Sequence, residues 1–306
     1  MAISIATPNE FASAFLADGR VEMVGFDVSL GWENGAAAYA SAFTDPVYDV
    51  TILPLTNFLI ARDKGLPLVG IPVFIDLFFP QMAIRVHKDS GITTPKELEG
   101  RRVGIRGFGF NPAVWIRGGM ADVYGFDFTK VQWVSATPNS MSQVDLSIPA
   151  GLSIESTDPD LTGALETGAI DAVLYDRGGP ALTANTVNIF DDPLTEVLRY
   201  YEQTGVFPLN SMLLAKREVL DANPGLGQAI VDAHDAARER YCAEVADEVT
   251  YMGIAVGWLR AHGMWPYHHR IENNRGALET IIRYTHEQGL ISKRPAVESL
   301  FFDGSQ

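Results

Sequence analysis

The chain has 306 residues, 47% of them hydrophobic, so it can bury a large core in one large or two medium domains. Its formal charge of −15 argues against nucleic acid and anionic membrane surfaces as main partners. No apolar run reaches the roughly 18 residues of a spanning helix, and the N-terminus lacks the basic and apolar regions of a secretory signal. We therefore expect a cytoplasmic protein, provided that Met1 is the natural start.

Short apolar stretches alternate with amphipathic ones along the chain, which is typical of an α/β fold. The predicted strands cover residues 3–6, 23–27, 50–53, 67–74, 82–86, 103–105, 131–134, 172–174 and 211–215. The predicted helices cover residues 36–43, 57–64, 94–98, 112–123, 160–167, 194–205, a long group within 218–262, and 274–288. Gly289 follows the last helix, where a left-handed residue commonly ends a helix.

Two segments, 74–85 and 205–214, are predicted to cross between lobes. The segment between them, 83–205, would then form an inserted lobe. The other lobe would combine residues 1–82 with residues 206–306. Paired crossings of this kind allow two lobes to close on a ligand by hinge motion.

The segment from Arg106 to Pro112 follows a predicted strand and opens a helix. Backbone amides at a helix start favour a carboxylate or phosphate, and glycine allows a close approach of the backbone. Arg106, Gly107, Phe108 and Asn111 are therefore candidate ligand contacts. The segment lacks the Walker lysine and the full dinucleotide fingerprint. The alternative is an ordinary turn in which Asn111 caps the helix and Pro112 is its first residue.

Further candidates follow in the predicted helix and after a later strand. Trp115 is either an aromatic wall of the site or core packing, and Arg117 is either a carboxylate anchor or an ion-pair partner. Tyr175, Asp176 and Arg177 end the strand at 172–174, where a ligand of an open α/β sheet would lie. Asp176 could donate a proton and Arg177 could hold a carboxylate. Alternatively, these two side chains satisfy each other.

Three further candidates lie in the first lobe. Thr51 lies in a predicted strand whose end could present a hydroxyl to ligand oxygens. His268 and His269 lie in an aromatic loop that could supply an acid or base, although an ordinary loop is the alternative. No carboxylate or cysteine lies at metal-ligand spacing from them, so we predict no metal site. The single cysteine, Cys242, excludes an internal disulfide.

Three segments carry a resemblance to a known family: VWIRGGMADVYG, YYEQTGVFP and IIRYTHEQGLISKR. Together with more generic motifs such as GAIDA, they resemble the 4,5-dihydroxyphthalate decarboxylases from about residue 50 to the end of the chain. The resemblance implies an α/β, two-lobed, type 2 periplasmic-binding-protein-like fold with the ligand cleft between the lobes. It also implies decarboxylation without a cofactor, with the metal requirement left open, and a homo-oligomer.

This chain departs from the family pattern at both crossings. The resemblance implies a histidine after the aromatic residues of the first crossing, where this chain has Gln81. It implies a second histidine after the Phe-Pro pair of the return crossing, where this chain has Asn210 and Ser211. Amides and a hydroxyl can orient a ligand, but they cannot shuttle protons near neutral pH as imidazole does.

We hypothesise that the chain is a lyase that decarboxylates a hydroxylated aromatic or related conjugated carboxylic acid. Arg106 or Arg177 would hold the substrate carboxylate, and Asp176, His268 or His269 would supply the proton. The alternative is a non-catalytic binding protein of the solute-binding type for an anionic or aromatic ligand. In both cases the partner is a small molecule, and no nucleic acid or membrane is expected.

Overall fold

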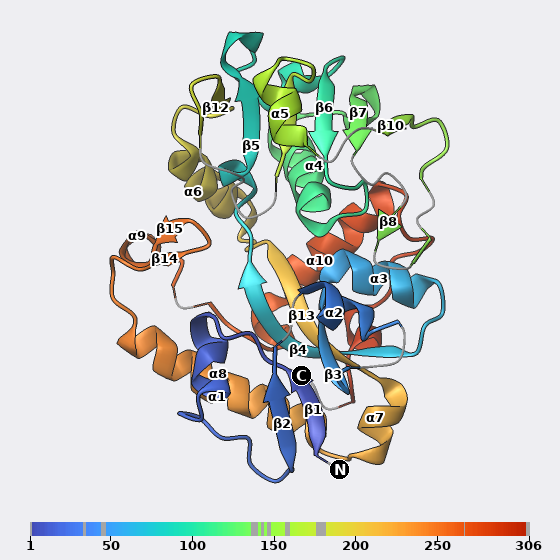
Figure 1. Cartoon of the computed structure of the whole chain (residues 1–306), viewed down its shortest axis with the longest axis vertical. Coiled ribbons are helices and arrows are strands. Elements are labelled where there is room, and N and C mark those ends of the chain that lie inside the picture. The colour runs from blue at the N-terminus through green and yellow to red at the C-terminus, as the bar shows by residue number, and fades with distance from the viewer. Residues whose placement is uncertain are drawn as a thin grey trace. The chain divides into compact units, whose positions relative to one another are not determined.

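The computed structural model describes residues 2–32, 35–43, 47–135, 140–141, 144–145, 148–156, 160–175, 182–265 and 267–303. The chain divides into two compact units, each with its own sheet (Figure 1). Unit 1 comprises Met1–Leu77, Leu209–Glu279 and Lys293–Gln306. Unit 2 comprises Phe78–Pro208 and Thr280–Ser292.

The lobe boundaries predicted from the sequence differ from the two units at Thr280–Ser292. The prediction placed this segment in the first lobe, whereas it is part of unit 2. It belongs to unit 2 because its side chains pack on the helix that follows the glycine-rich loop. The ring of Tyr284 packs edge-on against Trp115, with ring centroids 5.6 Å apart. The side-chain amide of Gln288 donates to the Val114 carbonyl over 2.9 Å.

Unit 1 is built on a five-stranded sheet in the order β2-β1-β3-β13-β4. Strand β1 pairs in parallel with β2 and β3, and β13 runs antiparallel to β3 and β4. The carboxyl ends of β3 and β4 therefore lie at the same edge as the start of β13. The strands are β1 (Ile3–Ala6), β2 (Val28–Gly31), β3 (Val50–Pro54), β4 (Leu68–Leu77) and β13 (Leu209–Lys216).

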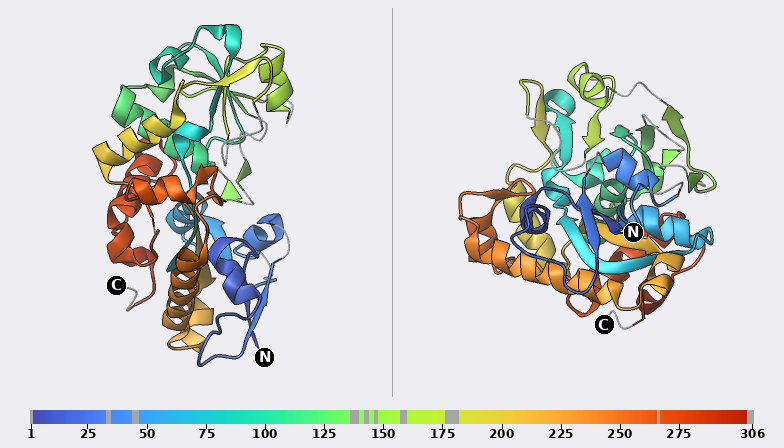
Figure 2. Two further views of the ribbon diagram at one scale, coloured as in Figure 1. Left: turned by 90° about the vertical axis from the view of Figure 1, so that its left-hand side faces the viewer. Right: turned by 60° about the horizontal axis from the view of Figure 1, so that its bottom comes forward.

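Helices and a small hairpin surround this sheet. The long helix α8 packs on β4 and on the 3₁₀ turn η1 (Figure 2). The helical elements are η1 (Phe11–Ser13), α1 (Ala14–Ala17), α2 (Gly35–Ala40), α3 (Leu55–Asp63), α7 (Arg217–Ala222), α8 (Leu226–Glu244), α9 (Val256–Ala261) and η6 (Val297–Leu300), together with the first half of α10 (Ile271–Glu287). The hairpin joins β14 (Thr250–Tyr251) to β15 (Ile254–Ala255).

Unit 2 contains a six-stranded sheet in the order β10-β7-β6-β11-β5-β12. Strands β10, β7, β6 and β11 are parallel neighbours, whereas β5 runs antiparallel to β11 and β12. Their bounds are β5 (Ile84–His87), β6 (Arg102–Ile105), β7 (Gln132–Ser135), β10 (Ile154–Ser156), β11 (Ala172–Leu174) and β12 (Thr186–Asn188). A short hairpin joins β8 (Ser140–Met141) to β9 (Val144–Asp145).

The helices of unit 2 are α4 (Asn111–Tyr124), α5 (Leu161–Glu166) and α6 (Pro193–Thr204). The 3₁₀ turns are η2 (Pro80–Met82), η3 (Lys88–Ser90), η4 (Pro95–Leu98) and η5 (Phe128–Lys130). Close packing at the sheet depends on Gly104 in β6, because a Cβ there would lie 2.8 Å from Ile170 Cδ1. Ile170 belongs to a buried cluster with Val134, Leu165 and Val173.

The predicted α/β class is confirmed, and the predicted element at 23–27 is wrong. Residues 23–27 form no strand; the strand begins at Val28. Gly25 has a φ of 91° and Val24 is exposed, so this apolar stretch has neither the extended backbone nor the burial of a strand. In the described part of the chain, no helix is long and apolar enough to cross a membrane.

Candidate functional site

The carboxyl ends of three parallel strands meet at one edge of the sheet in unit 2. Ile105 at the end of β6 pairs with Ser135 of β7 and with Leu174 of β11. Arg106 and Tyr175, which follow directly, therefore lie at this edge together with Ser135. Ligands of open α/β sheets bind outside the carboxyl ends of strands. We take this edge as the candidate site of unit 2.

Arg106 opens the loop between β6 and α4, and its side chain is exposed. Its guanidinium carbon lies 5.3 Å from the centroid of the Phe110 ring. The hydroxyl of Ser135 donates to the Arg106 carbonyl over 3.2 Å. Gly107 is buried, and its carbonyl accepts the Phe110 N–H over 3.2 Å. The carbonyls of Arg106 and Gly107 thus each accept a hydrogen bond that holds the backbone of the loop.

Helix α4 starts at this loop. Phe110 is the N-cap, in extended conformation, and its own side chain makes no capping hydrogen bond. The alternative for this segment, in which Asn111 is the N-cap, is wrong, because Asn111 is already helical, fully buried and followed by Pro112. Pro112 has no N–H, and the Val114 N–H donates to the Phe110 carbonyl over 3.0 Å, so the contribution of this helix start to anion binding is mainly the positive end of its dipole.

Phe108 and Trp115 lie in the interior of unit 2. Phe108 contacts Trp133 edge-on, with ring centroids 6.4 Å apart. Trp115 is fully buried against Tyr284. Both rings therefore pack in the core of unit 2. For Trp115, core packing was one of the two roles considered from the sequence.

Arg117 is fully buried and makes two hydrogen bonds to neutral oxygens. Its Nε donates to Gln288 Oε1 over 2.8 Å, and its Nη2 donates to the Phe108 carbonyl. The guanidinium carbon lies 4.0 Å from the centroid of the Phe108 ring. Burial lowers the pKa of Arg117 to about 9, so it stays charged at neutral pH. Neither predicted role is seen: Arg117 has no open path to a ligand and no ion-pair partner among the described side chains.

Tyr175 is half-buried after β11, and its hydroxyl lies 3.1 Å from the Thr162 hydroxyl. Burial raises the pKa of Tyr175, while hydrogen bonding to Thr162 and the charge of Arg85 oppose the shift. The phenol therefore remains a neutral hydrogen-bonding group. Asp176 and Arg177 lie outside the described residues, so their roles stay predictions.

A buried carboxylate lies at the corresponding edge of unit 1. Asp76, near the end of β4, is only 3% exposed. Its Oδ1 accepts the Ser211 N–H over 2.9 Å, and its Oδ2 accepts from Asn210 Nδ2 over 2.8 Å. The pairing of β4 with β13 shifts register beside Asp76, as at a β-bulge. The donors of Asn210 and Ser211, both predicted ligand contacts, are thus directed at Asp76.

Sequence reasoning missed Asp76, although the sequence contains a signal for it. The residue interrupts the apolar run LVGIPVFIDLFF, and a carboxylate inside a buried strand is rare unless it has partners. Tyr251 has a fully buried hydroxyl close to this carboxylate. Burial raises its pKa well above the usual range, and the charges of Tyr267 and Asp76 add to the shift.

Thr51 and Gln81 do not present their side chains as predicted. Thr51 is the second residue of β3, pairs with Leu214 and donates its hydroxyl to the Ala38 carbonyl. It is therefore buried within unit 1 and not at the carboxyl edge. Gln81 is buried in unit 2, beside a cavity of about 10 Å³, which is too small for a ligand.

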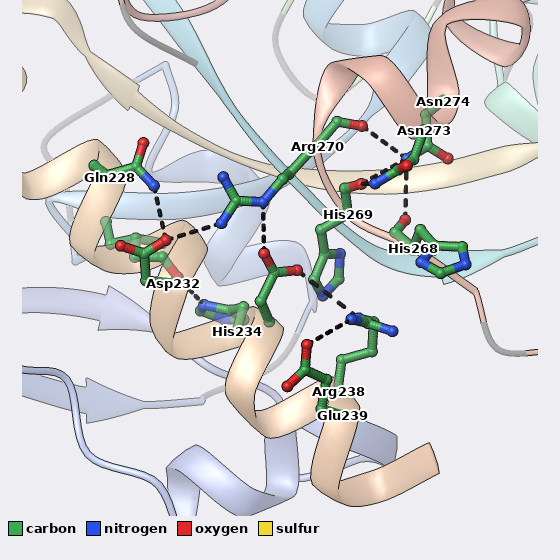
Figure 3. Close-up of polar contacts among 12 residues, drawn as sticks. Gln228, Asp232, His234, Arg238, Glu239, His268, His269, Arg270, Asn273 and Asn274 are labelled. Carbon is green, nitrogen blue, oxygen red and sulfur yellow. Dashed lines mark hydrogen bonds and ion pairs between the residues drawn. The ribbon is translucent and has the colours of Figure 1, made fainter. Parts of the chain in front are cut away.

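The two candidate histidines of unit 1, both drawn in Figure 3, differ in burial. His269 is buried, and its Nδ1 accepts the Phe74 N–H over 3.1 Å. Burial, then the nearby His234 and Arg238, hold its pKa well below the usual range. His268 is exposed, and burial of part of its ring lowers its pKa. His268 is thus the histidine of this pair that solvent reaches.

An amide and an ion-pair network fix this histidine loop. The side-chain amide of Asn274 donates to the carbonyls of His268 and His269 over 3.0 and 3.2 Å (Figure 3). Arg270 pairs with Asp235 over 2.7 Å and with Asp232 over 2.9 Å. Among the residues that the structure describes, no group of three His, Cys, Asp or Glu side chains could hold a metal ion.

The chain is similar to known proteins in sequence and in fold. It is 26% identical to 4,5-dihydroxyphthalate decarboxylase of Comamonas testosteroni, covering 99% of this chain and 97% of that protein. The Pseudomonas putida decarboxylase of the same name is 27% identical, over 59% of this chain and 72% of that protein. The predicted resemblance to these decarboxylases is confirmed.

The solved structures show the same fold. The periplasmic aliphatic sulphonate binding protein SsuA from Escherichia coli superimposes with a TM-score of 0.57 at 16% identity, covering 99% of this chain and 98% of that chain. The predicted periplasmic-binding-protein-like fold is confirmed. The family model described as NMT1/THI5 like matches residues 23–239, more than half of the chain. The chain belongs to the NMT1/THI5-like family.

Proposed function

We propose that this protein is a decarboxylase that acts on a hydroxylated aromatic or related conjugated carboxylic acid without a cofactor. The similarity to 4,5-dihydroxyphthalate decarboxylase supports this proposal, because it extends over nearly the whole of both chains. The observation that carries it is the position of Arg106 at the carboxyl edge of β6, beside the start of α4.

This position suits a carboxylate for an electrostatic reason. The chain has a net charge of −15, so its overall field repels an anionic substrate. A local guanidinium and the positive end of a 14-residue helix offset that repulsion. Arg106 would hold a substrate carboxylate, and Tyr175 at the same edge would contribute a neutral hydroxyl.

The reaction needs electron donation, a proton and departure of CO2. A ring hydroxyl pushes electron density toward the carbon that bears the carboxylate. A proton adds to that carbon, the carbon–carbon bond to the carboxylate breaks, and its electron pair returns to the ring. Asp176, His268 and His269 are the proposed proton donors. His268 suits this role better than His269, whose Nδ1 is engaged by the Phe74 N–H.

The effects of substitutions on kcat and KM distinguish the proton donor from the residue that holds the substrate carboxylate. Asp176→Asn or His268→Gln should lower kcat by about 10²–10⁴ if that residue is the proton donor. Arg106→Ala should mainly raise KM, because it removes a contact with the bound carboxylate. Arg101→Ala is the matched control, since Arg101 is an exposed arginine at the opposite end of β6. Equal kinetics of the Arg106 and Arg101 variants would contradict the proposed anchor.

The second candidate is a binding protein without catalytic activity. The absence of histidines at both crossings of the sequence favours it, because Gln81, Asn210 and Ser211 cannot replace imidazole as proton carriers. The likeness to SsuA is one of fold alone and is compatible with both candidates. Saturable binding of an aromatic carboxylate with no CO2 release would identify the binding protein.

We further propose that the protein acts in the cytoplasm as a homo-oligomer. The proposal rests on the decarboxylase resemblance. Light scattering coupled to size-exclusion chromatography measures the mass directly against the 33.4 kDa of one chain. A mass of one chain at micromolar concentration would overturn the oligomer.

A further inference from the structure

Arg117 carries a buried positive charge that no acidic side chain in the described part of the chain balances. It is 0% exposed, and its hydrogen bonds go to an amide oxygen and a backbone carbonyl. Within the described ranges, its Nη1 has no hydrogen-bond partner. This is unusual in a chain with 38 acidic and 23 basic residues, where a carboxylate partner would be easy to provide.

A structural role alone does not account for this charge. Moving a guanidinium out of water costs several kcal/mol unless a counter-charge or a full set of hydrogen bonds compensates. The aromatic rings of Phe108 and Trp133, 4.0 and 5.5 Å from the guanidinium carbon, compensate only in part. Arg283, on the segment packed against the same helix, illustrates the usual solution: it pairs with Asp122 over 2.5 Å.

The charge lies directly beneath the start of α4. Arg117 is the seventh residue of the helix, so its Cα is about 9 Å from the first residue along the axis. Helical side chains point back toward the N-terminus, and the contact of Nη2 with the Phe108 carbonyl shows that Arg117 does so. The guanidinium therefore supports the loop that ends at the start of the helix.

Two consequences for an anion at this loop follow. The positive charge adds to the positive end of the α4 dipole. In addition, the hydrogen bond from Arg117 to the Phe108 carbonyl holds the backbone of the loop that leads into the helix. Both effects act on a ligand at the edge where Arg106 lies.

We propose that Arg117 is a positioning residue for anion binding: it shapes the loop from Arg106 to Asn111 and supplies the positive charge that a bound carboxylate balances. The inference deepens the proposed function and rests on its assignment of a carboxylate to this edge. Arg117 would touch no substrate atom, and it would act through the Phe108 peptide and through the electrostatic potential at the helix start.

The test measures binding of phthalate, which is an aromatic dicarboxylate without ring hydroxyls, by calorimetry below the melting temperature of each variant. Arg117→Met should weaken binding at least about tenfold, equivalent to about 1.4 kcal/mol. Arg117→Lys retains the charge and should bind more tightly than Arg117→Met. Arg283→Met is the matched control, since it also removes an arginine of unit 2 and leaves the loop untouched; its affinity should equal that of the wild type.

Equal affinities of Arg117→Met and wild type, or equal losses in Arg117→Met and Arg283→Met, would overturn the inference. If Arg117→Met does not fold, the Nε–H resonance of Arg117 in the wild type replaces it, assigned with Arg117→Lys. This resonance should shift saturably as phthalate is added, and an unchanged resonance at saturation overturns the inference.

The experiments can overturn the decarboxylase proposal and the Arg117 inference independently of each other. Phthalate binding that depends on Arg117, with no CO2 release from hydroxylated analogues, supports the inference and overturns the decarboxylase. CO2 release with no dependence of binding on Arg117 overturns the inference and keeps the decarboxylase. A wild-type protein that binds no phthalate overturns the inference, whatever the outcome of the turnover assay.

Discussion

Asp76 and Arg117 are both buried charged residues, and different contacts compensate each of them for the loss of hydration. Asp76 receives two N–H donors from Asn210 and Ser211, which satisfy its oxygens within unit 1. Arg117 donates to two neutral oxygens in unit 2, and its Nη1 finds no partner among the residues that the structure describes. The first arrangement stabilises the fold at the end of β4, whereas the second leaves positive charge for a ligand.

The carboxylate of Asp76 should therefore contribute strongly to stability. Asp76→Ala leaves two donors without their acceptor, so the free energy of unfolding should fall by about 3 kcal/mol. Urea denaturation followed by circular dichroism measures the change. Asp221→Asn, at an exposed position of the same unit, is the control and should lie within about 0.5 kcal/mol of wild type. A similar small effect at Asp76 would contradict the hydrogen-bonded geometry.

Acid should destabilise the protein through its buried histidines. Burial lowers the pKa of His234 from 6.5 to about 4 in the folded state. Between these values the unfolded chain binds more protons, so the free energy of unfolding falls as pH falls from 6.5 to 4. The loss from His234 should reach about 3 kcal/mol at the lower end.

His234→Leu removes this titration and should flatten the dependence of stability on pH within that window. The residual slope then belongs to His269, whose pKa is lowered in the same direction, and to the carboxylates. Urea titrations at half-unit steps of pH test the difference between the two proteins. Parallel curves for wild type and variant would show that His234 is not buried as a neutral imidazole.

At the scale of elements, helix α4 joins the candidate site to the segment Thr280–Ser292. Gly118, in the middle of α4, faces the ring of Tyr284, which a Cβ at this position would overlap. The hydroxyl of Tyr284 donates to Asp122 over 2.6 Å on the same helix. The glycine thus allows the close packing that brings Gln288 to Arg117.

Two glycine substitutions should change the free energy of unfolding in opposite directions. Gly118→Ala should lower the free energy of unfolding by about 2 kcal/mol, because the Tyr284 ring must move. Gly276→Ala should raise it by about 0.5–1 kcal/mol, since Gly276 lies in helix α10 with nothing within 4 Å of its added Cβ. Stabilisation by both substitutions would contradict the packing of Tyr284 on α4.

Elements with a strong local pattern could be predicted from the sequence, and those that depend on distant partners could not. Strand β11 matches its prediction in full, and β3, β6 and α4 match within one residue at each end. Strands β10 and β12 were missed because each has three residues and β10 is largely exposed, so pairing with neighbours defines them. The loop at Arg106 was found because a strand, glycines and a helix start follow one another locally.

Residues whose role depends on long-range contacts escaped prediction. Asp76 accepts from Ser211, 135 residues away, and Arg117 donates to Gln288, 171 residues away. No local pattern indicates either contact. Thr51 was misplaced for the related reason that the sequence cannot show which end of a strand a hydroxyl occupies.

At the scale of the whole molecule, the chain belongs to the NMT1/THI5-like family, and its relatives include proteins named as decarboxylases. The fold itself is shared with a sulphonate-binding protein, so it does not decide between binding and catalysis. Each unit places its polar groups at the carboxyl edge of its sheet: Arg106, Ser135 and Tyr175 in unit 2, and Asp76 in unit 1. The chemistry at these edges decides the function.

The measurement that tests the decarboxylase most directly is CO2 release from 4,5-dihydroxyphthalate and other hydroxylated aromatic acids, with thermal-shift binding assays in parallel. Metal-stripped protein and protein supplied with divalent cations should be compared, which also determines any metal requirement. We predict CO2 release with at least one of these acids and its reduction in Arg106→Ala. Saturable binding across the panel without any CO2 release would contradict the decarboxylase and identify a protein that only binds its ligand.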